Sequence, residues 1–60
     1  MYNLRNKNGA LCIGSLKKCR KVMADFVAGY QKDGFVVETV QKDMTLVSGL
    51  YADVLYIKRM

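Results

Sequence analysis

The sequence contains no histidine, and this absence excludes much of the chemistry that enzymes and metal proteins use. Without histidine there is no Ser–His or Cys–His nucleophile pair, and the commonest zinc ligand is missing. The five acidic residues are scattered, with no close pair in the sequence for acid–base catalysis or metal binding: Asp25, Asp33, Glu38, Asp43 and Asp53. We therefore expect a protein that is not an enzyme, with no catalytic residues, no cofactor and no small-molecule substrate.

Cysteine is also scarce, and the two cysteines do not have the spacing of a metal site. Cys12 and Cys19 are seven positions apart, which differs from a C-x2-C zinc knuckle, and there is no second pair. We therefore expect no bound metal. Cys19 is best interpreted as a small core residue, and a strand-to-helix disulfide with Cys12 is the alternative.

Long apolar runs are missing as well. No stretch approaches 18 apolar residues, so we expect no transmembrane segment, and the first residues lack the apolar core of a signal peptide. These absences predict a cytoplasmic protein with reduced thiols. Proline and low-complexity segments are absent too, and 52% of the residues are apolar, which is typical of a folded chain rather than a disordered one. Sixty residues allow a single domain (1–60) of marginal stability, a size at which a partner subunit often contributes to folding.

Acidic residues are absent from the first 24 positions, which makes the charge distribution uneven. Residues 1–24 hold six cations and no acid, whereas residues 25–60 hold four cations and five acids, and the net charge is +5. This asymmetry favours a nucleic acid, an anionic membrane surface or an acidic protein as partner.

A β-hairpin is predicted over residues 2–14, because the Asn8–Gly9 pair is a strong turn signal. Pairing across that turn places Lys7 opposite Ala10 and Leu4 opposite Ile13. The predicted core face then carries Tyr2, Leu4, Leu11 and Ile13, and the other face carries Asn3, Arg5, Lys7, Ala10 and Cys12.

A helix is predicted over residues 16–32. Its apolar residues fall within an arc of about 140° on the helical wheel: Leu16, Cys19, Val22, Met23, Phe26, Val27 and Tyr30. Ser15 is suited to cap the start of the helix, and Gly34 is suited to end it. The apolar stripe indicates that the helix packs on a sheet.

Residues 35–58 are rich in β-branched and aromatic side chains and are predicted to form strands, with turns at Lys42–Asp43 and Ser48–Gly49. The fold class is therefore α+β: a small antiparallel sheet of four to five short strands in ββ-α-ββ order, with one amphipathic helix packed across one face. Both faces of the later strands are apolar, and one helix covers only one of them. The surplus indicates a dimer or partner surface, for which Tyr51, Val54 and Tyr56 are the candidates.

The basic helix start is the second candidate site. Helix starts favour acidic residues, yet this one is strongly basic, so either the cations are simply solvated or an anion offsets their cost. The candidate anion or partner contacts are Ser15, Lys17, Lys18, Arg20, Lys21, Arg5 and Lys7. Arg5 and Lys7 are expected on the far face of the sheet, away from the others.

Two functions follow from these features. The first is a small protein-binding regulator or inhibitor, of the accessory type that phages and mobile elements encode, acting through an exposed sheet face or edge on an acidic protein or on itself as a homodimer. The alternative is a nucleic-acid-binding protein without sequence specificity that uses the basic helix start. Binding to a membrane surface is disfavoured, because the apolar side of the helix is needed to cover the sheet.

Overall fold

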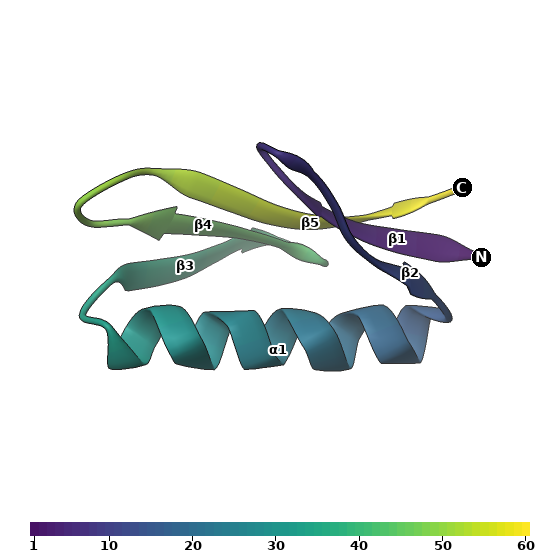
Figure 1. The fold of residues 1–60 in the computed structure, drawn as a ribbon, viewed down its shortest axis with the longest axis horizontal. Coiled ribbons are helices and arrows are strands. Elements are labelled where there is room, and N and C mark those ends of the chain that lie inside the picture. Colours follow the sequence, from purple (N-terminus) through teal and green to yellow (C-terminus); the bar gives the residue numbers. More distant parts are fainter.

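A computed structural model of the protein describes all residues 1–60 and confirms the α+β fold class (Figure 1). Five antiparallel strands form one sheet, and a single helix packs against it. The elements are β1 (Tyr2–Asn6), β2 (Gly9–Gly14), α1 (Leu16–Lys32), β3 (Val36–Gln41), β4 (Met44–Ser48) and β5 (Asp53–Arg59). The strand order is β2-β1-β5-β4-β3, which places β5 in the centre and leaves β2 and β3 as the two edges.

The start and the end of α1 follow from capping residues. Ser15 has extended backbone geometry, and its side-chain oxygen accepts a hydrogen bond from the backbone N–H of Lys18 at 3.1 Å. This bond satisfies one of the free N–H groups of the first turn. At the other end Gly34 has a φ of 88°, a left-handed conformation that glycine adopts without strain. The chain then turns back into β3.

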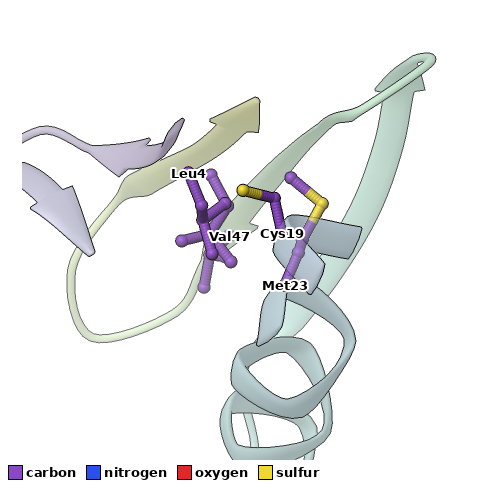
Figure 2. Close-up of a cluster of buried hydrophobic side chains, with 5 residues drawn as sticks. Leu4, Cys19, Met23 and Val47 are labelled. Carbon is purple, nitrogen blue, oxygen red and sulfur yellow. The ribbon is translucent and has the colours of Figure 1, made fainter. Parts of the chain in front are cut away.

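The core lies between α1 and one face of the sheet. Its fully or nearly fully buried hydrophobic residues come from three strands and the helix: Leu4, Cys19, Met23, Val47 and Leu55. Figure 2 shows Cys19 of α1 directed towards Leu4 and Val47 of the sheet, with Met23 beside it. Five such residues make a small core, as expected for a chain of this length.

The first hairpin differs from the predicted one in register. Its two-residue loop is Lys7–Asn8 rather than Asn8–Gly9, and a β-bulge at Leu4/Arg5 then shifts the pairing back by one residue, so that a net slip of one residue remains. As a result Leu4 lies opposite Cys12 and not opposite Ile13. A slip of one residue exchanges the two faces of a strand.

The exchange of faces has direct consequences for the residues of β2. Cys12 packs against the core, whereas the two residues predicted to be there, Leu11 and Ile13, are 36% and 50% exposed.

Local and tertiary hydrogen bonds account for the loop position. The side chain of Asn6 accepts from the N–H of Asn8 at 2.9 Å, and the N–H of Lys7 donates to the carboxylate of Asp53 at 3.3 Å.

The later turns are partly as predicted. Lys42 and Asp43 form the loop between β3 and β4, and Asp43 has a φ of 61°. The turn predicted at Ser48–Gly49 is present but begins one residue later and is longer, because β4 continues to Ser48 and a four-residue loop (49–52) leads to the antiparallel β5. The single helix is too short and too polar to cross a membrane.

Candidate protein-interaction face

The sheet has one face covered by α1 and one face that no other element covers (Figure 1). Side chains alternate between the two faces along each strand. Because Leu4, Val47 and Leu55 point to the helix, their neighbours in sequence point away from it. We call this uncovered side the outer face, and its residues are Asn3, Arg5, Ile13, Val36, Glu38, Met44, Leu46, Ser48, Val54, Tyr56 and Lys58.

The centre of the outer face is apolar. Tyr56 of β5 lies directly opposite Met44 of β4, and Val54 lies opposite Leu46 in the next row. Side chains that face each other across antiparallel strands are about 5 Å apart, so these four form one continuous surface. Leu46 is 44% exposed, and Val36 on the edge strand is 66% exposed. The apolar surface therefore covers β5 and β4, and Val36 on the β3 edge lies diagonally from Leu46.

Charged residues border this apolar centre. Arg5 pairs with Tyr56 across β1 and β5, and Lys58 lies two residues further along β5. On the opposite side, Glu38 pairs with Leu46 across β3 and β4. Asn3 lies beside Lys58, and its side-chain oxygen is buried without a hydrogen-bond partner. The rim is thus positive on the β1 side and carries one acid on the β3 side.

The predicted interface residues do not all lie together. Val54 and Tyr56 share the outer face, but Tyr51 lies in the loop before β5, in an aromatic cluster on the helix side. The ring of Tyr51 contacts Phe35 at a centroid distance of 4.9 Å and Tyr30 at 6.3 Å, and Tyr30 contacts Phe35 at 5.3 Å. Tyr51 therefore belongs to the packing at the end of α1 and not to the candidate interface.

A buried carboxylate holds this end of the molecule together. Asp53 is 8% exposed, and its oxygens accept hydrogen bonds from the N–H groups of Lys7 and Val54 and from the hydroxyl of Tyr30 at 3.1 Å. Burial raises the pKa of Tyr30. The hydrogen bond from its hydroxyl to the Asp53 carboxylate raises this pKa further. These bonds join the first hairpin, α1 and β5, so Asp53 has a structural role.

The basic residues are spread over several places. Arg20 makes two hydrogen bonds to the carboxylate of Asp43, at 2.8 and 3.0 Å, which lower the pKa of Asp43 and raise that of Arg20. Lys21 lies 3.7 Å from Asp25 on the exposed side of the helix. Lys17 is exposed at the helix start and makes no ion pair with a carboxylate.

The remaining candidate contacts also have local roles. Ser15 caps the helix, and the aliphatic part of Lys18 lies against Gly14. Arg5 lies on the outer face, as expected, but Lys7 does not. Its ammonium group donates to the backbone oxygen of Ala52 at 2.9 Å and lies 5.0 Å from the ring of Tyr51, beside the C-terminal end of α1.

These positions separate the cations along the molecule. The Tyr30 end of α1, where Lys7 lies, is about 20 Å from Lys17, at 1.5 Å per helical residue. The structure therefore does not gather the seven candidate contacts into one basic patch.

Two other features bear on the chemistry of the surface. An open hollow of about 380 Å³ lies along α1, lined by Asp25, Phe26, Gly29, Tyr30 and Asp33. No three side chains among cysteine, aspartate and glutamate lie together in a group that could hold a metal ion.

Comparisons of the chain with protein-family models, with curated proteins and with solved structures gave no match.

Among the apolar residues of the outer face, the sequence predicts Val54 and Tyr56 as interface residues but not Met44, Leu46, Val36 or Ile13. The sequence of residues 44–48 gives no alternating signal for Met44 and Leu46, because the covered positions between and beside them are Thr45 and Val47, one polar and one apolar. Ile13 was missed because the predicted register placed it in the core.

Proposed function

We propose that this protein is a small non-enzymatic regulator or inhibitor that binds another protein through its outer face. The observation that carries the proposal is the apolar surface formed by Tyr56, Met44, Val54 and Leu46, which lies in the middle of the sheet with no element covering it. Isolated exposed apolar side chains are ordinary on protein surfaces. A continuous apolar patch surrounded by polar residues is typical of an interaction site.

The outer face as a whole is at the low end of the area that a protein–protein contact uses. Five strands about 4.8 Å apart, each of five or more residues, give a surface on the order of 400 Å². The apolar centre formed by Tyr56, Met44, Val54 and Leu46 is one part of that area. A partner strand added at the β3 edge would bring the buried area towards that of a transient protein–protein interface.

The rim indicates the chemistry of the partner. Arg5 and Lys58 flank the apolar centre on the β1 side, so a partner with acidic groups at that side and apolar groups in the middle fits best. The exposed β3 edge offers unpaired backbone groups for an additional strand.

The alternative, nucleic-acid binding through the helix start, has less support. Phosphate binding needs several free cations close together. Arg20 is held by Asp43, Lys21 is next to Asp25, and Lys7 is at the other end of the molecule. Lys17 and Lys18 alone remain for a phosphate contact at the start of α1.

Site-specific photo-cross-linking in the producing cells tests the proposal. A benzophenone amino acid replaces Leu46 on the outer face or, as the matched control, Ala28 on the exposed side of α1. We expect a discrete protein adduct from position 46 and none from position 28. The adduct should disappear when Val54→Asp is added and persist with Lys32→Asp.

The opposite pattern would overturn the proposal. Adducts from position 28 alone, or adducts from position 46 that nuclease treatment removes, would assign binding to the helix or to nucleic acid. Circular dichroism of each variant shows whether the fold is retained.

A further inference from the structure

Both cysteines lie in the layer between α1 and the sheet, close to the same residue of β1. Cys12 lies directly across from Leu4 and packs against the core, and Cys19 is a fully buried member of that core. Figure 2 shows the sulfur of Cys19 directed towards Leu4. The thiol of Cys19 also lies 3.7 Å from the backbone oxygen of Tyr2, two residues before Leu4.

The chain between the cysteines holds them in this arrangement. It leaves β2 at Gly14 and enters α1 through the Ser15 cap, with six residues between the two cysteines. The side chain of Lys18, in the first turn of the helix, lies over Gly14. The two thiols are therefore on adjoining elements with a short connection.

The ionisation of Cys19 is consistent with neighbouring thiols. Burial raises the pKa of Cys19, and the nearby Cys12 thiol raises it further. Cys12 is partly exposed on the edge strand β2, whereas Cys19 is inaccessible to solvent. A solvent-borne oxidant therefore meets Cys12 first.

We propose that Cys12 and Cys19 form an oxidisable dithiol that a hydroperoxide converts to an intramolecular disulfide between β2 and α1. The Cys12 thiolate attacks the peroxide oxygen and gives a sulfenic acid, with hydroxide or alkoxide as the leaving group. The Cys19 thiol then loses its proton and attacks the sulfur of Cys12, which releases water. With hydrogen peroxide the balance is two thiols and one peroxide to one disulfide and two waters.

The disulfide would covalently join the edge strand to the first half of the helix. Reduced, the cysteines act as small apolar core residues, which is the role that sequence analysis favours for Cys19. Oxidised, they would fix the position of α1 on β2. This proposal does not depend on the proposed binding function, since it concerns the opposite side of the sheet.

The first test is oxidation of the reduced protein with a slight excess of hydrogen peroxide. Mass spectrometry of the intact protein should show loss of two hydrogen atoms. Tryptic digestion without reductant should give residues 8–17 linked to residues 19–20. Cys19→Ser should instead stop at a sulfenic acid that dimedone traps on Cys12, and Cys12→Ser should leave Cys19 unmodified.

The second test is thermodynamic and does not depend on how fast the buried thiol reacts. The protein is equilibrated with reduced and oxidised glutathione, once folded and once in guanidinium chloride. If the fold brings the thiols together, the equilibrium constant for the disulfide should be higher in the folded protein by about 30-fold or more. An equal or lower constant in the folded protein, or oxidation that yields only intermolecular dimers, would overturn the proposal.

Discussion

The guanidinium group of Arg20 contacts both carboxylate oxygens of Asp43 and so ties α1 to the loop between β3 and β4. The loop is also held to the central strand, because the backbone oxygen of Asp43 accepts from the N–H of Ile57 at 2.9 Å. Asp43 also has left-handed backbone geometry, which aspartate and asparagine tolerate better than most residues. The pair is partly buried, with 22% of the Asp43 side chain exposed.

Removing this contact should lower stability and change its pH dependence. The Arg20 hydrogen bonds lower the pKa of Asp43, so the contact stabilises the folded state above the unfolded pKa of about 4 and is lost as the pH falls through the folded pKa. We expect Asp43→Asn to cost on the order of 0.5–1 kcal/mol at pH 7 and much less at pH 2–3. Urea unfolding across this range measures the difference. Asp25→Asn is the matched control, and an equal effect there would show that the Arg20 contact is not responsible.

The two faces of the sheet should respond differently to the same truncation. Leu4 is fully buried under α1, and Leu4→Ala should cost about 2–5 kcal/mol, a large part of the stability of a small domain. Leu46 on the outer face is 44% exposed, and Leu46→Ala should change the free energy of unfolding far less. Chemical denaturation compares the two, with Leu4→Met as a milder variant should Leu4→Ala not fold. Similar losses at both positions would mean that the outer face is covered.

The hydrogen bond between Tyr30 and Asp53 should be measurable as a coupled pair. Tyr30→Phe removes one donor and is expected to cost about 1.5–3 kcal/mol, because the acceptor is a buried carboxylate. Asp53→Asn should cost more, since it also weakens the bonds to the N–H groups of Lys7 and Val54. A double-mutant cycle gives the coupling, and additive effects would contradict the bond.

The same bond gives a spectroscopic prediction. Because the pKa of Tyr30 is raised, the folded state favours the neutral phenol. Its contribution to the free energy of unfolding is fully present below the unfolded pKa of about 10 and is lost as the pH rises through the higher folded pKa. In an ultraviolet titration of the phenols, one of the four tyrosines should therefore ionise at higher pH than the others. That late step should be absent in Tyr30→Phe.

The basic helix start should be a site where stability is easily gained. No acidic residue lies in the first turn of α1, so Lys17→Glu should stabilise the protein by about 0.5–1 kcal/mol by removing an unfavourable interaction with the helix dipole and adding a favourable one. Lys32→Glu in the last turn is the control at the opposite end of the helix dipole, and it should destabilise the protein because it removes a favourable cation there. Thermal unfolding at low and high salt measures both, and the effects should shrink as salt increases.

The fold class could be predicted because its signals are local. The apolar stripe of α1, the Ser15 cap and the glycine after the helix all depend on neighbouring residues, and the observed helix is Leu16–Lys32. The surplus of apolar residues on the later strands likewise indicated an uncovered face. Val54 and Tyr56, the predicted interface residues of β5, lie together on the outer face.

The register of the first hairpin depends on contacts far away in the sequence. The Lys7–Asn8 loop is fixed partly by Asp53, which is 46 residues from Lys7, and no local pattern encodes that bond. The bulge in β1 and β2 then places Cys12 in the core. For the same reason the Arg20–Asp43 contact and the position of Tyr51 could not be read from spacing, because each joins residues that only the folded chain brings together.

Covalent footprinting of the native assembly is the most direct test of the outer face as the binding surface. The protein is isolated under mild conditions from producing cells, labelled with a photoactivated carbene reagent, and compared with the purified chain alone. If the outer face is the interface, Leu46, Val54 and Tyr56 should be labelled in the isolated chain and protected in the assembly, while Phe26 and Leu50 should be labelled equally in both. Protection around Lys17 and Lys18 with full labelling of Leu46 would contradict it and would place the partner on the start of the helix.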